Sequence, residues 1–180
     1  MWKEFKPALR FLLIFVGLYF IGNLVYGFFI SFKGNTPDEI TNLVAHQSAW
    51  ILNNFFGNEV NAVLNLSGPT VFLKTGESVV LNIYEGCNGI NVFIVFVAFI
   101  VAFNGNLKRL FWFIPFGILI LHLSNLLRIV FLYWTAVRFH RYFYYVHKYI
   151  FTGVIYAVVF ILWIIWVYSL NDKKKAISTE

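Results

Sequence analysis

The sequence has few charged residues and a single cysteine. Lys, Arg, Asp and Glu make up 12% of the 180 residues, whereas 60% are hydrophobic. One cysteine cannot close a disulfide within the chain or supply a cysteine-rich metal site. Internal repeats, low-complexity tracts and a second domain are also missing from the sequence. These absences exclude a disulfide scaffold and a cysteine-rich metal protein.

The formal net charge of +6 does not indicate a nucleic-acid-binding protein. The basic residues lie beside apolar runs instead of forming a stripe. These runs are long enough to span hydrocarbon, and the mean hydropathy is +0.74. The chain is therefore predicted to be an all-α integral membrane protein that contacts the lipid bilayer and binds no nucleic acid.

We predict a four-span helical bundle, with residues 1–180 as a single membrane domain. The first span lacks the cleavage pattern of a removable signal peptide and is interpreted as a retained anchor. An alternative threading divides the third span at Pro115 or Ser124, and would place Cys87 and His147 on opposite faces unless the short pieces are re-entrant. The four spans cover about residues 11–32, 87–104, 110–134 and 149–170.

Clusters of lysine and arginine orient these spans. The positive-inside rule places the clusters in the cytoplasm. Residues 33–86 and 135–148 then lie outside, although both segments also hold basic residues. The cytoplasmic clusters are Lys3, Lys6 and Arg10 before the first span, Lys108 and Arg109 before the third, and Lys173, Lys174 and Lys175 after the fourth.

Residues 33–86 are predicted to form a small extracytoplasmic insertion that contains a helix and a hairpin. Thr36-Pro37-Asp38-Glu39 has the form of a capping box, with proline at the first helical position. Apolar residues then recur at helical spacing up to Gly57. Two β-prone runs, 70–74 and 79–84, are separated by Thr-Gly-Glu and indicate a hairpin that leads directly to Cys87.

Three residues of this threading, Cys87, Arg128 and His147, lie on the same side of the membrane. A lone cysteine is most often a packing residue, but Cys87 opens a predicted helix, where the helix dipole favours thiolate. Arg128 lies inside an apolar span, where a charge is costly and is a functional hypothesis by default. Snorkelling and a charge pair with Glu85 are the structural alternatives for Arg128. His147 directly precedes the fourth span, at the depth expected for Cys87.

Four polar neighbours are candidate substrate-binding residues. Asn91 lies one helical turn after Cys87, and Asn125 lies three residues before Arg128 on the same helical face. His122 is interpreted as a hydrogen-bonded packing residue, and His140 competes with His147 as the acid-base group. The four candidates are Glu85, Asn88, Asn91 and Asn125.

Taken in order, these motifs resemble the exosortase/archaeosortase family. The resemblance rests on Glu85-Gly86-Cys87-Asn88-Gly89, on Asn125-Leu126-Leu127-Arg128-Ile129 and on His147. It covers about residues 76–170, and residues 1–75 match only in general layout. Family members usually carry Ala-Cys-Ser-Gly where this chain has Gly-Cys-Asn-Gly. In length the chain is closer to the compact bacterial variants.

The resemblance implies a cysteine transpeptidase or protease of the bacterial cytoplasmic membrane, with its active site on the outer face. Its substrates would be exported proteins with a C-terminal signal composed of a short motif, a membrane span and a basic tail. Cys87 would be the nucleophile, His147 the acid-base and Arg128 the oxyanion stabiliser, with no metal or organic cofactor.

Two other functions remain open from the residues alone. The first is a non-catalytic membrane subunit or chaperone that binds a partner transmembrane helix. The second is a small transporter, which is less favoured because one buried charge does not form the paired relay expected of a transporter.

Overall fold

A computed structural model describes residues 2–103 and 107–177 of the chain. The side chains of Lys3, His140 and residues 173–175 lie outside this description, as does the predicted end of the second span at Asn104. The described chain is mostly helical and carries a small three-stranded antiparallel sheet.

Among the described residues, three helical segments are long and apolar enough to cross a membrane. They are Phe5–Lys33 within helix α1 (Trp2–Lys33), Leu107–Arg138, which is helix α4, and Phe143–Ser169, which ends within helix α6 (Phe151–Ile177). A multi-pass membrane protein is thereby supported. The segment predicted as the second span is helix α3 (Ile90–Ala102), which has only 13 residues. At ~1.5 Å per residue, α3 is ~20 Å long, less than the ~30 Å of a typical hydrocarbon core.

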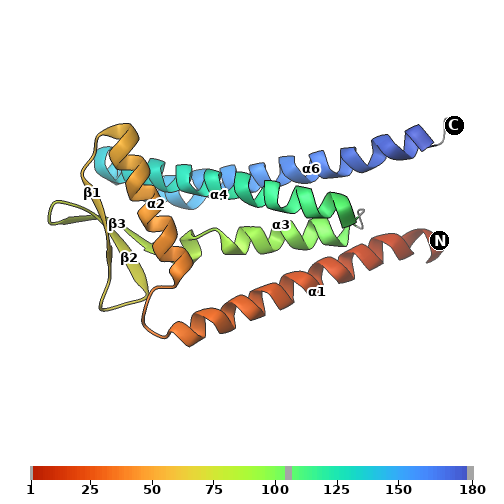
Figure 1. The fold of residues 1–180 in the computed structure, drawn as a ribbon, viewed down its shortest axis with the longest axis horizontal. Coiled ribbons are helices and arrows are strands. Elements are labelled where there is room, and N and C mark those ends of the chain that lie inside the picture. The colour runs from red at the N-terminus through yellow and green to blue at the C-terminus, as the bar shows by residue number, and fades with distance from the viewer. Residues whose placement is uncertain (1, 104–106, 178–180) are drawn as a thin grey trace.

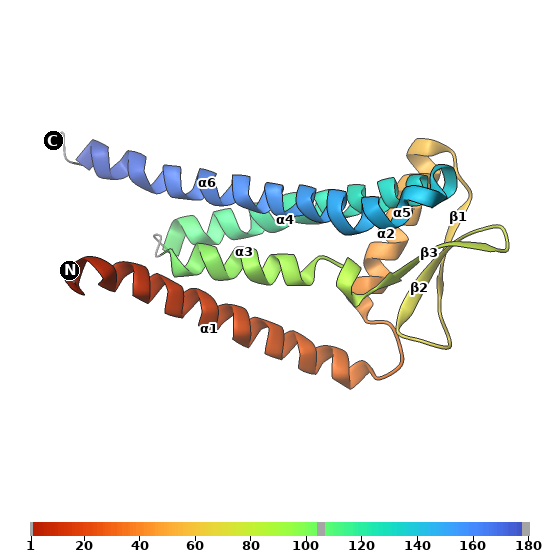
Figure 2. The ribbon, with the colours of Figure 1, turned by 180° about the vertical axis from the view of Figure 1, so that it is seen from behind.

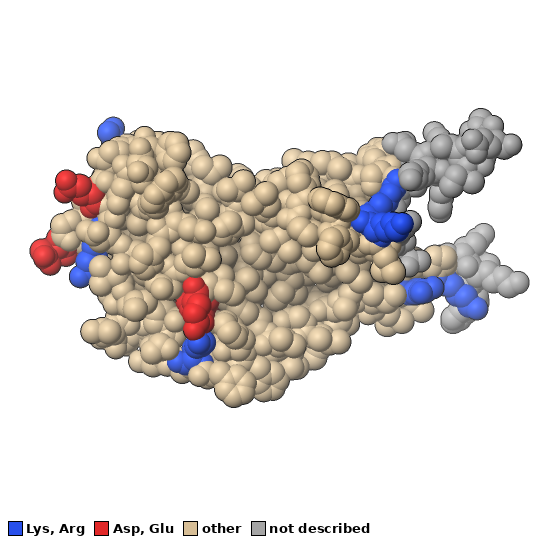
Figure 3. Space-filling model, viewed as in Figure 1, with Lys and Arg blue, Asp and Glu red and all other residues tan. Residues whose placement is uncertain are grey.

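The long helices lie along one axis of the molecule. Both described chain ends are at one end of this axis, and the sheet and helix α2 (Glu39–Phe56) are at the other (Figures 1 and 2). On the face drawn in Figure 3, charged side chains lie toward the two ends and a stretch without charge lies between them. This distribution is the one expected of a bundle that spans hydrocarbon.

Helix α4 is continuous through both proposed break points. Pro115 lies inside the helix, and the Ser124 hydroxyl donates a hydrogen bond to the Ile120 carbonyl at 2.8 Å, one turn earlier. The threading that divided this segment into two half-spans is therefore wrong. Proline is tolerated in membrane helices because neighbouring groups satisfy the freed carbonyl.

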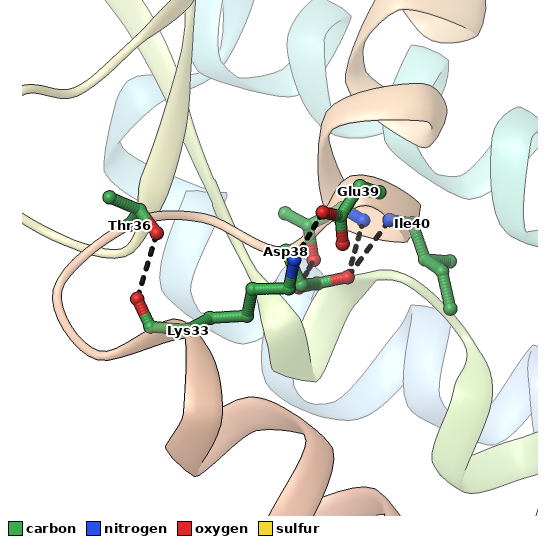
Figure 4. Close-up of polar contacts among 6 residues, drawn as sticks. Lys33, Thr36, Asp38, Glu39 and Ile40 are labelled. Atoms are coloured by element: carbon green, nitrogen blue, oxygen red, sulfur yellow. Dashed lines mark hydrogen bonds and ion pairs between the residues drawn. The ribbon is translucent and has the colours of Figure 1, made fainter.

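Helix α2 begins two residues later than its sequence motif predicts. Asp38, not Thr36, is the N-cap, and its carboxylate accepts hydrogen bonds from the Ile40 and Thr41 amides at 3.0 and 2.9 Å (Figure 4). The Thr36 hydroxyl instead donates to the Lys33 carbonyl at 2.8 Å, at the end of α1. The helix ends at Gly57 as predicted, with φ of 64°.

Residues 33–86 were predicted to hold a helix and a hairpin, and they contain one strand more. The predicted hairpin is present as β2 (Thr70–Thr75) and β3 (Ser78–Tyr84). Strand β1 (Val60–Leu64) pairs antiparallel with β2 and was not predicted. The description of the fold as all-α is corrected accordingly. Strand β1 is short and contains Asn and Ala, so its strand character comes from pairing with β2.

Two hydrophobic cores hold the molecule together. One joins α2 and the sheet to α4, and the other packs α3 between α4 and α6. A Cβ atom at Gly117 would lie 2.1 Å from the Phe96 ring, so glycine is required for α3 to approach α4 this closely. The first core includes Leu52, Val71, Ile83, Cys87 and Ile129, and the second includes Phe96, Ile100, Leu121, Val159 and Trp166.

Candidate functional site

Cys87 lies in a short connection between the sheet and helix α3. It ends a single 3₁₀ turn, η1 (Glu85–Cys87), and α3 begins only at Ile90 after Gly89, whose φ is 88°. The sequence predicted Cys87 in the first turn of this helix, but Cys87 precedes α3. The α3 dipole therefore does not directly stabilise a Cys87 thiolate. Its side chain is 5% exposed and forms part of the core beside the sheet.

Asn125 and Arg128 connect this loop to helix α4. The Asn125 side-chain amide donates to the Cys87 carbonyl at 2.8 Å. The Arg128 Nη1 donates to the Asn125 Oδ1 at 3.4 Å, since the two residues are three apart on one helical face. Within the described residues, Arg128 Nε is buried and has no hydrogen-bond partner. A guanidinium held in this way has donor capacity left for a ligand.

Asn88 is fully buried and joins three elements. Its Nδ2 donates to the Tyr26 hydroxyl of α1 at 2.7 Å and to the Thr41 Oγ1 of α2 at 3.2 Å. Its Oδ1 accepts from the Ile90 amide at 3.0 Å, at the start of α3. All these hydrogen bonds are structural, so the side chain of Asn88, a candidate substrate-binding residue, holds the loop around Cys87 in place.

Two adjoining cavities bring the predicted catalytic residues together. Cys87 and His147 line one of about 250 Å³, whose other walls come mainly from β3 and from Ile129 and Leu132 of α4. Arg128, Asn91 and His147 line the second, of about 300 Å³. His147 borders both, so residues from three separate elements converge where the loop, α4 and the start of the last helical segment meet.

Tyr84, which sequence reasoning missed, also borders both cavities. A Cβ atom at Gly86 would lie 2.3 Å from the Tyr84 ring, so this ring packs directly over residue 86. In the sequence, this contact is indicated only by Gly86, which follows two residues after Tyr84 at the end of β3. The absence of a side chain at Gly86 therefore positions Tyr84 beside the thiol.

Burial raises the pKa of the Cys87 thiol above its usual value. The Arg128 guanidinium and polar groups of Tyr84 act in the opposite direction, whereas the Glu85 carboxylate adds to the increase. The pKa of Tyr84 is also raised, first by the charge of a Cys87 thiolate and then by burial. A raised pKa favours the protonated thiol, so Cys87 requires a proton acceptor to act as a nucleophile.

Three of the four histidines have described side chains. His147 lies in a single π-helical turn, η3 (Val146–Ile150), and its ring stacks on Phe143 with centroids 5.8 Å apart. His122 Nε2 is 2.9 Å from the Gln47 Oε1 of α2, which confirms its predicted hydrogen-bonded role. His46 lies on the exposed side of α2, with its Nδ1 2.9 Å from the Asn42 carbonyl. Of these three, His147 is the one that lines the cavity of Cys87.

Within residues 2–103 and 107–177, no group of three His, Cys, Asp or Glu side chains is arranged to hold a metal ion. Comparisons of the chain with protein-family models, with curated proteins and with solved structures found no match.

Proposed function

We propose that the protein is a membrane-embedded cysteine transpeptidase or protease that cleaves C-terminal sorting signals of exported proteins. The observation that carries the proposal is the meeting of Cys87, Arg128 and His147 around two adjoining cavities. A buried thiol, an imidazole and a guanidinium with donor capacity left are the groups required for acyl transfer through a thioester. The resemblance of the same residues to the exosortase/archaeosortase motifs supports the same chemistry.

Each residue has one role in the proposed reaction. His147 takes the thiol proton while the Cys87 sulfur attacks the scissile carbonyl. Arg128 stabilises the negative charge that develops on the carbonyl oxygen, where exclusion of water makes a fixed charge effective. His147 then protonates the leaving amine, and the thioester passes to an acceptor amine or to water.

We further propose that α3 also crosses the membrane, as the second of four spans, and that the site faces the outside of a bacterial cytoplasmic membrane. Helix α3 is short, but it packs against α1, α4 and α6, so protein surrounds much of its length. The site lies at the end of the bundle opposite the chain ends (Figures 1 and 2). A substrate with a membrane span and a basic cytoplasmic tail would present its recognition motif at this end.

The test is processing of a tagged protein from the same genome that carries the tripartite C-terminal signal. Co-expression with the wild-type chain should shorten the substrate, and Cys87→Ala should abolish shortening with unchanged amounts of enzyme in the membrane. His147→Ala should lose activity about as completely, because members of a catalytic unit are not additive. His46→Ala, at an exposed histidine outside the cavities, is the matched control and should process normally. Normal processing by Cys87→Ala would remove Cys87 as the nucleophile.

The burial and raised pKa of Cys87 favour a second candidate, a non-catalytic subunit or chaperone that binds a partner helix. In that role Cys87 only packs. Cys87→Ser and Cys87→Ala would then both retain partner binding in a pull-down from membranes, and no substrate would be shortened by the wild-type chain.

A further inference from the structure

Strand β3 lies at one edge of the three-stranded sheet and leads into the loop that carries Cys87 (Figure 2). Five consecutive residues of β3, 80–84, line the cavity of about 250 Å³ that Cys87 also lines. Side chains alternate between the two faces of a strand, so a cavity on one face would be lined by every second residue. This cavity therefore runs along the edge of β3.

The hydrogen bonds of β2 show which backbone groups of β3 point toward this edge. Thr70 of β2 lies opposite Tyr84 of β3. Thr70 donates its N–H to the Gly68 carbonyl at 2.8 Å and accepts from the Asn65 amide at 3.0 Å, so its backbone groups point toward β1 and not toward β3. Opposite residues of an antiparallel pair exchange either both hydrogen bonds or neither. Tyr84, and Asn82 two residues before it, therefore point their backbone groups away from β2.

The two edges of the sheet differ in how their backbone groups are paired. Among the residues that the structure describes, neither the outward N–H nor the outward C=O of Asn82 has a hydrogen-bond partner. At the opposite edge, the Val60 N–H of β1 donates to the Asn53 Oδ1 at 2.8 Å, and the Val60 carbonyl accepts from the Asn53 Nδ2 at 2.9 Å. Helix α2 thus caps the β1 edge, whereas the edge beside Cys87 can pair with another strand.

We propose that the recognition segment of the substrate binds as an extended strand, pairs its backbone with Asn82 at the edge of β3 and places an apolar side chain in the cavity of Cys87. This inference rests on the proposed function. Backbone pairing gives affinity for an extended segment, and the cavity selects the side chain. Most residues that line this cavity are apolar, among them Ile129, Leu132 and Phe143. Cys87 follows the end of β3 by three residues, so a segment held on β3 lies beside the thiol.

Proline at position 82 tests the pairing in the processing assay of the tagged substrate. Asn82→Pro removes the outward N–H, and proline is tolerated on an edge strand where the N–H does not belong to the ladder. With substrate below saturation, processing should slow at least about fivefold, as expected for the loss of one hydrogen bond. Asn82→Ala keeps the N–H and should lose less activity than Asn82→Pro.

Ala62→Pro is the matched control at the other edge of the sheet. Ala62 lies two residues after Val60 on β1, so its N–H also points away from β2. This variant removes an outward N–H far along the sheet from β3 and should process the substrate normally. Thermal unfolding in detergent should give similar midpoints for the two proline variants.

The substrate gives an independent test that leaves the enzyme unchanged. Proline and alanine would replace each residue of the recognition segment in turn. Because proline has no N–H, it should impair processing more than alanine at the position that pairs with Asn82, and about equally at the two adjacent positions, whose N–H groups point away from β3. Aspartate should block processing at the position whose side chain enters the apolar cavity.

The outcomes separate the strand pairing from the reaction. If the wild-type chain shortens no substrate, the proposed function fails and this inference fails with it. If the wild-type chain and Ala62→Pro both process the substrate, normal processing by Asn82→Pro would overturn the strand pairing alone. Equal effects of proline and alanine along the whole segment would also overturn the pairing, even if Asn82→Pro does not fold.

Discussion

Burial and charge act in opposite directions on the Cys87 thiol, and this opposition can be measured directly. Cys87 is the only cysteine, so a small thiol reagent reports on it alone. Because burial raises the pKa of Cys87, labelling should be slow at neutral pH and should accelerate above the usual thiol pKa of about 8.5.

Two charge variants should move this pH profile in opposite directions. Arg128→Gln removes the cation that lowers the pKa of Cys87, so the profile should move to higher pH. Glu85→Gln removes a carboxylate that raises the pKa, so the profile should move to lower pH. Arg138→Gln, whose guanidinium lies over Trp134 outside both cavities, is the control and should leave the profile in place. An unchanged profile in Arg128→Gln would remove Arg128 from the neighbourhood of the thiol.

A second residue-scale prediction concerns the contact between Gly86 and Tyr84. Gly86→Ala would place a methyl group 2.3 Å from the Tyr84 ring, so the ring must move. Overpacking of this kind costs about 1–3 kcal/mol, which thermal unfolding in detergent would detect as a lower midpoint. The double variant Gly86→Ala with Tyr84→Ala should recover most of the loss. Gly17→Ala, where an added Cβ meets nothing within 4 Å, should not destabilise the protein.

Tyr84 also marks the limit of what the sequence could predict about the site. Cys87, Arg128 and His147 were predicted because a lone thiol, a charge inside an apolar span and a histidine at a span boundary are each unusual. Tyr84 is one of 10 tyrosines, and the glycine two residues after it is a weak local signal. Its place between the cavities depends on the turn after β3, which only the folded chain defines. The same turn makes Asn88 a linker of α1, α2 and α3.

At the scale of elements, the length of the apolar runs predicted the long helices correctly, whereas the first and last residues of the elements were predicted less accurately. The three long spans were predicted because their apolar runs need no tertiary information. Strand β1 was missed because its pairing partner, β2, supplies the hydrogen bonds that define it. The start of helix α3 was predicted at Cys87, three residues too early. The helix begins after Gly89, which has a positive φ, and an apolar run in the sequence does not indicate this conformation.

The start of α2 gives an element-scale prediction with a matched pair of variants. Asp38→Ala should lower the free energy of unfolding by about 1–2 kcal/mol, because the carboxylate accepts two amide hydrogen bonds of the first turn. Thr36→Ala alters the residue that the sequence motif favoured, but its hydroxyl only donates to the end of α1, so the loss should be smaller. Denaturation of both variants in detergent would rank them. An equal or larger loss in Thr36→Ala would place the cap at the position read from the sequence.

The cavity that Cys87 and His147 line is formed mainly by β3 and α4, at one end of the long axis of the molecule. The sheet, α2 and the ends of the helices meet at this end, and the described chain ends lie at the opposite end (Figure 1). The two cores follow the same division, one beside the sheet and one between the helices.

The arrangement of the helices leads to a prediction about topology. Helix α4 begins with Lys108 and Arg109 at the same end of the bundle as both described chain ends, so these basic residues should share one side of the membrane (Figure 1). The positive-inside rule makes that side the cytoplasm. Reporter fusions after Gly105 and after Lys175 should both give a cytoplasmic signal, and a fusion within the β2–β3 turn, after Gly76, should give an external one. A cytoplasmic signal after Gly76 or an external one after Gly105 would mean that α3 does not cross, and the proposed active site would then lack its outer position.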